Sequence, residues 1–365
     1  MNDMENMQLN PDRLKIARLR RKMTYTSLAA ATGLSSKSVA EYEKADGLFP
    51  PSEPTIKLLA ETLGYPVGFL CGEDAEFVDP SSVSFRSLKS MKAADQHAAE
   101  AAGSLGVIVN GYFESIFNLP ECNLPNLRGY EPEAAAEALR DKWGLGVKSI
   151  SNMINMLEAN GVRVFSLSEN TLDVDAFSFW KNDTPYVFLN TQKSAERSRF
   201  DAAHELGHLV LHRHGSPQGK AAEEEADSFA SALLMPRRTI LAIKMPFPTL
   251  DGVISIKSNW LVSAVALIVR MKNVGILTEW QYRTLMVEAN KRGLRRGEIN
   301  GIPRERSLMI DKLLQALKAD RIDMSTLASM LAIPIDELAN LLFKVAVIVG
   351  GGSTSNSKRP DLKLV

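Results

Sequence analysis

Cysteine is scarce in this chain of 365 residues, which contains only Cys71 and Cys122. The two cysteines lie far apart and match no spacing of a metal-binding cysteine pair. Their scarcity excludes a disulfide-rich scaffold and a cysteine zinc site. We expect two buried structural thiols in a reducing compartment, without a disulfide between them.

Long apolar runs and an excess of charge are missing as well. No apolar run reaches 18 residues, and residues 1–8 are polar, without the basic flank and apolar stretch of a secretory signal. The 43 basic and 43 acidic residues cancel, which argues against a protein that coats nucleic acid over its whole surface. We therefore expect a cytoplasmic protein that does not enter a membrane and whose nucleic-acid contacts are confined to local patches.

Histidine is also rare, but its distribution is uneven. Four of the five histidines lie within residues 204–214. His204 and His208 are one helical turn apart, so both can bind one metal ion while Glu205 addresses a water molecule on that ion. Two ordinary helix residues would be the alternative, and the clustering disfavours it. The pattern indicates metal-assisted peptide hydrolysis.

A catalytic zinc ion needs a third protein ligand, and residues 223–236 supply candidates. Interpreted as a helix that stops near Pro236, this run turns an apolar stripe inward. At roughly 100° per residue, Glu223 lies about 50° from the centre of that stripe and Glu225 about 110° away. Glu223 is therefore the expected third ligand, with Glu225 as the alternative. Asp227 would orient a ligating histidine, or else is a solvated helix residue.

These two segments resemble the ImmA/IrrE-like metallopeptidases, whose pattern joins a His-Glu-Leu-Gly-His helix to a later Glu-x-x-Ala-Asp/Asn-x-Phe-Ala-x-x-Leu-Leu-Met-Pro segment. The resemblance implies a zinc ion held by His204, His208 and Glu223, with Glu205 as the general base. It also implies an endopeptidase for a specific cytoplasmic protein, since members of this family cleave phage or mobile-element repressors and stress regulators.

A basic cluster near the N-terminus precedes a second pattern. Residues 13–22 contain six Lys or Arg and no acid, and residues 24–43 predict two short helices broken at a glycine, with Ser35 as the N-cap of the second. A further helix at residues 55–63 closes a small bundle. Residues 9–72 resemble the Cro/C1 (XRE) helix-turn-helix family.

This resemblance implies a domain that binds a double-stranded DNA operator as a homodimer. The residues expected at the DNA are Ser35, Ser36, Lys37, Ala40 and Glu41 in the major groove, and Arg20, Arg21 and Lys22 at the phosphates. Two features depart from the family: Tyr25 stands where glutamine is common, and the loop at residues 46–51 is long. The alternative is a bundle used only for protein contacts.

The expected fold class is mainly α with a small β-sheet (α+β): an N-terminal all-α helix-turn-helix bundle, a zincin-like domain and a helical C-terminal region. The expected division is residues 9–72 for the helix-turn-helix domain, 73–130 for a linker and a helix that is a possible dimer element or an intradomain helix, 131–295 for the zincin-like metallopeptidase domain, 305–349 for the helical region and 350–365 for a flexible tail. Strands are expected at residues 162–167, 176–180 and 186–189, and an edge strand among them would align a substrate peptide. The helical region is expected to bind a partner or to dimerise.

These patterns predict a DNA-binding transcriptional regulator that carries a zinc endopeptidase domain. The alternative is an autoregulating repressor or antitoxin of a toxin–antitoxin or mobile-element module, whose zincin-like domain binds a partner such as a toxin without proteolysis. A sensor of a small ligand ranks third. His212 and His214 would either stabilise the oxyanion or have a structural role.

Overall fold

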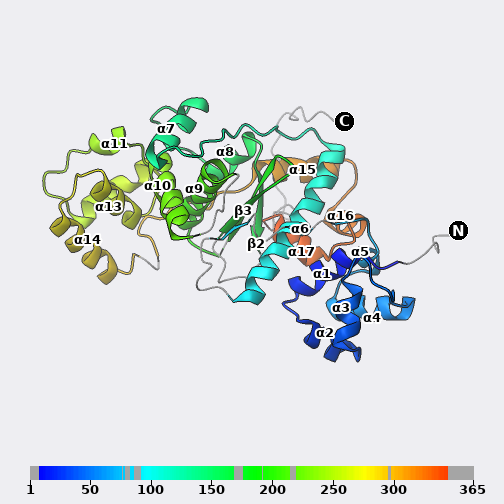
Figure 1. The fold of residues 1–365 in the computed structure, drawn as a ribbon. Helices are drawn as coiled ribbons and strands as arrows, with labels where there is room; N and C mark the ends of the chain where they lie inside the picture. The colour runs from blue at the N-terminus through cyan, green and yellow to red at the C-terminus, as the bar shows by residue number, and fades with distance from the viewer. Residues whose placement is uncertain are drawn as a thin grey trace.

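The computed structural model describes residues 8–75, 77–78, 83–85, 92–167, 176–190, 192–213, 219–294 and 297–343. Within these ranges, helices surround a small sheet, and the N-terminal bundle lies at the opposite end of the molecule from α13 and α14 (Figure 1). The expected class, mainly α with a small β-sheet, is confirmed. His214 and the expected flexible tail at residues 350–365 lie outside the described residues.

The N-terminal bundle contains α1 (Pro11–Arg20), α2 (Tyr25–Thr32), α3 (Ser36–Tyr42), α4 (Glu53–Leu63) and α5 (Val67–Leu70). The side chains of Thr24 and Ser35 each accept a backbone N–H, which caps α2 and α3. Gly33, at φ 70°, turns the chain between these two helices. The buried guanidinium of Arg18 donates to the carboxylate of Glu43 at 2.6 Å, which fixes α1 against the end of α3. The predicted helix-turn-helix is formed.

The sheet has the strand order β1-β3-β4-β2 among the described residues. Its strands are β1 (Ser84–Phe85), β2 (Arg163–Leu167), β3 (Ala176–Lys181) and β4 (Thr184–Asn190). β3 pairs antiparallel with β1 and β4, and β2 pairs parallel with β4. Asn182 and Asp183 connect β3 to β4 with φ 46° and 62°, as a two-residue hairpin turn requires. The three longer strands begin and end within two residues of the predicted positions.

Alternation along the strands gives the sheet two different faces. One face carries stacked aromatic rings, and those of Phe177 and Phe188 are 4.6 Å apart and almost parallel. Helix α6 (Ala93–Ile116) covers this face, while α9 (Ala195–Leu211) covers the other (Figure 1). The sheet therefore lies between the long helix that follows the N-terminal bundle and the helix that carries the histidines.

The small residues of α6 pack inside the chain, as the intradomain alternative predicts. A Cβ atom added to Gly106 would lie 2.5 Å from Cζ of Phe188, and one added to Gly103 would lie 3.1 Å from Cε1 of Phe179. Ala98, Ala99 and the other small residues around them are buried as well. The intradomain alternative holds because only glycine and alanine allow the helix to lie this close to the aromatic rings.

The remaining helices enclose the histidine helix on its far side. They are α7 (Pro132–Lys142), α8 (Met153–Ala159), α10 (Lys220–Leu234), α11 (Arg237–Leu241), α12 (Leu250–Ile256), α13 (Ala264–Asn273) and α14 (Glu279–Lys291). A 3-10 turn (Lys257–Asn259) and Leu261, at φ 56°, separate α12 from α13. Cys122 is exposed and Cys71 is partly exposed, so the expectation of two buried thiols is wrong.

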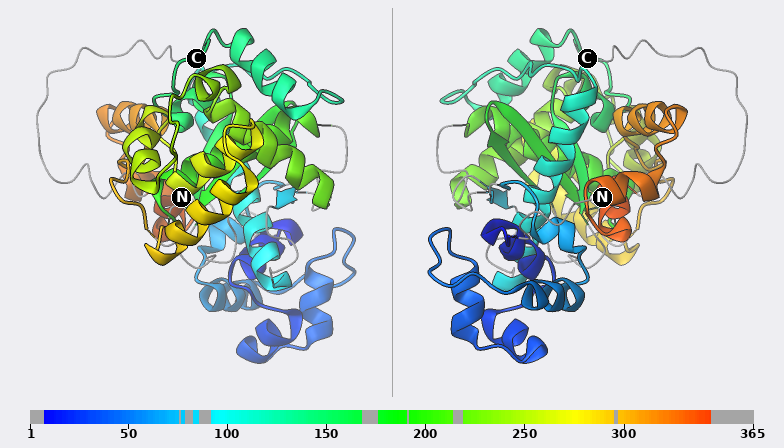
Figure 2. Two further views of the ribbon diagram at one scale, coloured as in Figure 1. Left: turned by 90° about the vertical axis from the view of Figure 1, so that its left-hand side faces the viewer. Right: turned by 90° about the vertical axis from the view of Figure 1, so that its right-hand side faces the viewer.

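The C-terminal helices return to the N-terminal half of the molecule (Figure 2). They are α15 (Leu308–Ala319), α16 (Met324–Met330) and α17 (Ile335–Leu341). Glu158 of α8 accepts hydrogen bonds from Ser307 Oγ and from the amide of Met309, and burial raises the pKa of Glu158 to about 7 in spite of them. Ser166 Oγ of β2 donates to the carbonyl of Asn340. The C-terminal region is thus joined to the sheet and to α8.

Among the described residues, no single helix is long and apolar enough to cross a membrane, and one pair of segments, Leu250–Asn259 and Ala264–Asn273, meets that test only when taken together across a bend of 96°.

Gly106→Ala should lower the free energy of unfolding by about 1–3 kcal/mol, because the added methyl group meets an aromatic stack that cannot move freely. Gly111→Ala is the matched control on the same helix, since a Cβ atom there meets nothing within 4 Å. We expect that control to be neutral or to stabilise by up to about 1 kcal/mol. Urea unfolding of both variants measures the difference, and equal stabilities would contradict the packing described.

Candidate functional site

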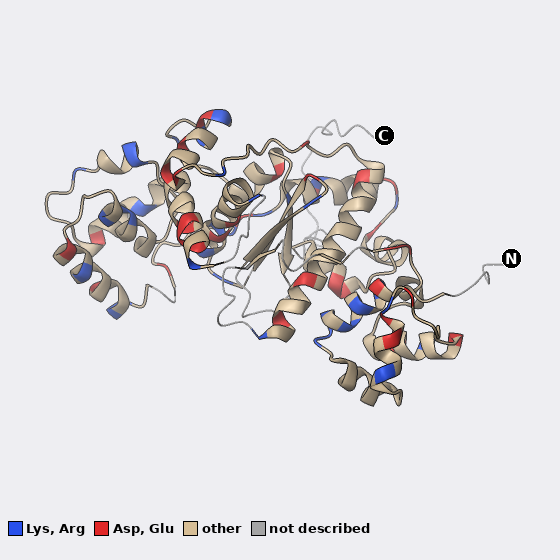
Figure 3. Ribbon diagram, in the orientation of Figure 1, with Lys and Arg blue, Asp and Glu red and all other residues tan. Residues whose placement is uncertain are grey.

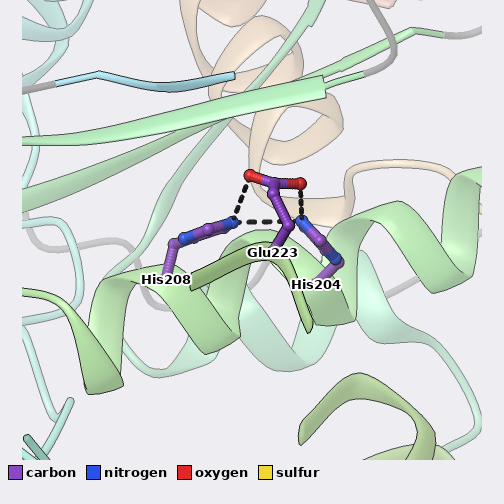
Figure 4. Close-up of side chains that lie close together, drawn as sticks. All are labelled: His204, His208 and Glu223. Carbon is purple, nitrogen blue, oxygen red and sulfur yellow. Dashed lines mark hydrogen bonds and ion pairs between the residues drawn. The ribbon is translucent and has the colours of Figure 1, made fainter. Parts of the chain in front are cut away.

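Three side chains of the metal-binding pattern converge between α9 and α10 (Figure 4). Nε2 of His204 and Nε2 of His208 are 3.1 Å apart. Of the two carboxylate oxygens of Glu223, Oε2 lies 3.4 Å from Nε2 of His204 and Oε1 lies 3.4 Å from Nε2 of His208. Gly207 allows α10 to approach, since a Cβ atom there would lie 3.0 Å from Cδ1 of Phe229. The two histidines are buried, and the side chain of Glu223 is 25% exposed.

These three residues fit a zinc ion. A tetrahedral ion with bonds of about 2.0–2.1 Å separates its ligand atoms by about 3.4 Å, close to the 3.1 Å between the two Nε2 atoms and to the 3.4 Å from each Nε2 to its nearer oxygen of Glu223. His204, His208 and Glu223 also form a group able to hold a metal by the closeness of one ligand atom from each. Two nitrogens and one oxygen are donors that zinc commonly takes in catalytic sites, and three protein ligands leave a fourth position open.

The tautomer of each histidine suits this role. Nδ1 of His204 lies 2.9 Å from Oδ1 of Asp227, so it donates its proton there and leaves Nε2 as a lone-pair donor. Nδ1 of His208 lies 3.1 Å from Nδ1 of His212, whose Nε2 is 2.8 Å from Oε2 of Glu225. If Nε2 of His212 donates to this carboxylate, Nδ1 of His212 accepts the proton of Nδ1 of His208. Nε2 of His208 then carries a lone pair that faces the other two ligands.

The position of Glu225 separates the two glutamates that the sequence left open as third ligand. Glu225 pairs with His212 on the outer side of the site, whereas Glu223 lies against His204 and His208. Asp227 contacts His204 as expected of an orienting residue. His212 contacts a histidine ring and a carboxylate and therefore takes the structural alternative.

The protonation states of the cluster favour metal binding at neutral pH. Burial lowers the pKa of His208 to about 4, although Glu223 opposes this shift, so the imidazole is neutral. Burial acts to raise the pKa of Glu223, but hydrogen bonds with His204 and His208 outweigh it and lower the pKa to about 2. A neutral imidazole and an ionised carboxylate are the forms that bind metal.

Glu205 lies one residue beyond the first histidine and is fully buried. Oγ of Ser178 on β3 donates to Oε2 of Glu205 at 2.6 Å. The sequence analysis did not predict this contact. The one signal for it is that Ser178 is a small polar residue between Phe177 and Phe179, in a strand whose side chains point alternately to its two faces. The sheet therefore fixes the orientation of the carboxylate beside the metal ligands.

The second helix of the helix-turn-helix presents a mixed surface. Lys37 is exposed, while Ser36, Ala40 and Glu41 are partly exposed. The Ser35 hydroxyl is used for the N-cap of α3, accepting from the amide of Ser38. Glu41 pairs with Lys44 and accepts from the amide of Leu48, so it organises the loop after α3. The long loop carries two exposed apolar side chains near its middle, those of Leu48 and Phe49.

The three basic residues expected at phosphates all form ion pairs within the molecule, and of these only Arg20 is buried. Arg20 is buried and donates to Oε2 of Glu337 at 2.6 Å, and Arg21 donates to Oε1 of the same carboxylate at 2.7 Å. Lys22 pairs with Asp95 of α6 at 2.5 Å. Figure 3 shows acidic and basic positions side by side where α1 meets α6 and α17. These cations join the bundle to the rest of the chain.

Comparison with family models gives two matches. Residues 14–70 match a model described as helix-turn-helix, and residues 157–272 match a peptidase model described as the IrrE N-terminal-like domain. The chain thus contains one region similar to helix-turn-helix domains and another similar to the IrrE N-terminal-like domain. The search of curated proteins finds no match to this chain. The first match covers α1 to α5, and the second covers the sheet from β2 together with α9, α10 and the cluster of His204, His208 and Glu223. The predicted resemblance to an XRE-type helix-turn-helix fused to an ImmA/IrrE-like domain is confirmed.

Glu225→Gln should weaken zinc binding by about 10–100-fold, because the amide holds His212 and His208 less firmly in the required tautomers. Glu224→Gln is the matched control, since Glu224 is exposed on the same helix and forms an ion pair with the exposed Lys220 at 3.5 Å. Competition with a chromogenic zinc chelator measures both affinities. Equal affinities in the two variants would show that the outer contact does not orient the site.

Glu337→Ala should destabilise the protein by about 3 kcal/mol, because it leaves the buried guanidinium of Arg20 without its carboxylate. Glu53→Ala removes the exposed pair with Lys57 and should cost less than about 1 kcal/mol. Urea unfolding followed by circular dichroism measures both. A loss at Glu337 as small as that at Glu53 would contradict a buried ion pair.

Proposed function

We propose that this protein is a DNA-binding transcriptional regulator whose IrrE-like domain is a zinc endopeptidase for a specific regulatory protein. The observation that carries the proposal is the convergence of His204, His208 and Glu223 at 3.1–3.4 Å beside a carboxylate aligned by Ser178. A helix-turn-helix match in the same chain supports the regulatory half.

The chemistry follows from the groups present. A zinc ion held by the three ligands would activate a water molecule and polarise the scissile carbonyl. Glu205 would accept a proton at its carboxylate and pass it to the departing amine. Ser178 would hold Oε2 of that carboxylate, which leaves Oε1 to accept the proton of the water molecule. Asp227 and the His212–Glu225 pair would keep the histidines in the binding tautomer.

The DNA-binding half would use α3 as its recognition helix. Lys37 and the partly exposed residues of α3 remain the groups proposed to face base edges. Because Arg20 and Arg21 are paired with Glu337, phosphate contacts would come from other positions or from a rearranged bundle. A homodimer on a palindromic operator and a cytoplasmic location complete the proposal.

One observation favours a second function, that of a repressor or antitoxin whose zincin-like domain binds a partner such as a toxin without cleaving it. The carboxylate of Glu205 is 0% exposed in this conformation, so it has no free path to a substrate. Under this alternative, Glu205 would be a structural acceptor for Ser178, and regulation would survive without the carboxylate.

Glu205→Gln separates the two functions. We expect the variant to keep about one zinc per chain by elemental analysis, because the three ligands are intact, and to lose at least about 100-fold in cleavage, because an amide cannot accept the proton. Cleavage is measured by comparing new protein N-termini in cells that express the wild type or the variant.

Two further variants control the metal measurement. His204→Ala and Glu223→Ala should lose the zinc, whereas Glu224→Ala should keep it. Zinc bound by the wild type with identical N-termini and identical promoter repression in wild type and Glu205→Gln would overturn the endopeptidase and support the binding function. A wild type that takes up no zinc would overturn both the metal site and the hydrolysis.

A further inference from the structure

β3 is the strand that lies closest to the candidate base. Its residue Ser178 donates to Glu205, and its residue Trp180 donates from Nε1 to the carbonyl of Leu209 on the same helix, at 3.2 Å. On one side β3 pairs with β4 over its whole length. Its other side, called here the outer edge of β3, pairs with β1.

The chain itself occupies this edge. Ser84 lies opposite Ser178 and Phe85 opposite Phe177, in antiparallel register. β1 belongs to the segment that connects α5 to α6, which the sequence indicated only as a linker. In Figure 4, the pale blue β1 runs beside the green strands above the three labelled side chains.

The register places Ser84 on the side of the metal centre. Residues directly opposite in an antiparallel pair project from the same face, and Ser178 projects toward Glu205. Ser84 is 1% exposed, and its hydroxyl has no hydrogen-bond partner among the described residues. Val83 belongs to the apolar core that contains the aromatic face of the sheet. A buried hydroxyl without a hydrogen-bond partner costs free energy, so β1 is imperfectly matched to the edge of β3 at Ser84.

We propose that the outer edge of β3 is the surface that receives an extended segment of the protein substrate, and that β1 occupies it as an internal blocking strand. The inference rests on the proposed function of the metal centre. An unpaired strand edge offers backbone N–H and C=O groups that any extended segment can pair with. Antiparallel pairing here carries the segment past Ser178, next to the groups that would cleave it.

The geometry also states what kind of segment fits. A substrate in the register of β1 needs an unfolded or loop segment with a small residue opposite Ser178, because the corresponding Ser84 is buried beside β3. An apolar residue before it would replace Val83 in the core.

Ser84→Pro tests the proposal in the full-length chain, because proline disrupts the short strand pairing. Ser84→Ala is the matched control, since it removes the hydroxyl and keeps the strand. The binding probe is a fluorescein-labelled peptide with the sequence of residues 81–90 of this chain. We expect anisotropy to show at least tenfold tighter peptide binding by Ser84→Pro than by the wild type or Ser84→Ala, whose tethered strand competes at high effective concentration. Hydrogen exchange across residues 176–181 should accelerate in the proline variant alone.

Ser84→Asp is a second way to release the strand, because it buries a carboxylate beside Glu205, and it should behave like the proline variant even if the latter folds poorly. Equal peptide binding by all four proteins, or exchange in β3 unchanged in both Pro and Asp variants, would overturn the proposal. Neither readout needs hydrolysis. The expected peptide binding together with protein N-termini that are identical in wild type and Glu205→Gln would therefore mark failure of the endopeptidase function alone, whereas cleavage by proteins that do not bind the peptide would mark failure of this inference.

Discussion

Side-chain alternation in β3 is the constraint on which the rest of the molecule depends. Phe177 and Phe179 project to one face and stack with the rings of β4, which gives α6 a flat apolar surface. Ser178 projects to the other face and donates to Glu205 of the histidine helix. A slip of one residue in this strand would turn phenylalanine toward the candidate base and serine toward α6. The same register therefore sets both the metal centre and the packing of the N-terminal half.

The two halves of the chain are also joined by buried charge. Glu337 near the C-terminus receives Arg20 and Arg21 from the first helix of the helix-turn-helix domain. Arg199 of α9 pairs with Glu305, and Lys257 pairs with Glu298, so the segment before α15 is held to the metal domain in the same way. Buried ion pairs add little net stability, but each partner strongly penalises loss of the other, and such contacts specify one arrangement. The C-terminal region acts as a connection between the DNA-binding bundle and the domain that carries the metal ligands.

This arrangement gives the proposed regulator a physical link between its two activities. β1 follows the helix-turn-helix bundle in sequence and lies beside the residue that orients Glu205. α6 comes next and contacts both α1 and the aromatic face of the sheet. A change in the position of the bundle would therefore act on the strand edge and on the helix that covers the sheet, without any need for a contact between DNA and the metal centre.

The local features of this protein follow from patterns of neighbouring residues. The four-residue separation of two ligands, the helical period and the N-caps depend on neighbours in the chain, so the pair His204 and His208 and the helix-turn-helix could be predicted from them. The angular argument for Glu223 over Glu225 agrees with their positions because both lie on one regular helix. Tertiary structure alone decided the rest. The pairing of Arg20 with Glu337, the pairing of β1 with β3 at Ser84 and the contact of Ser178 with Glu205 join residues far apart in sequence. No local pattern encodes such contacts, because they depend on which elements pack together and in which register.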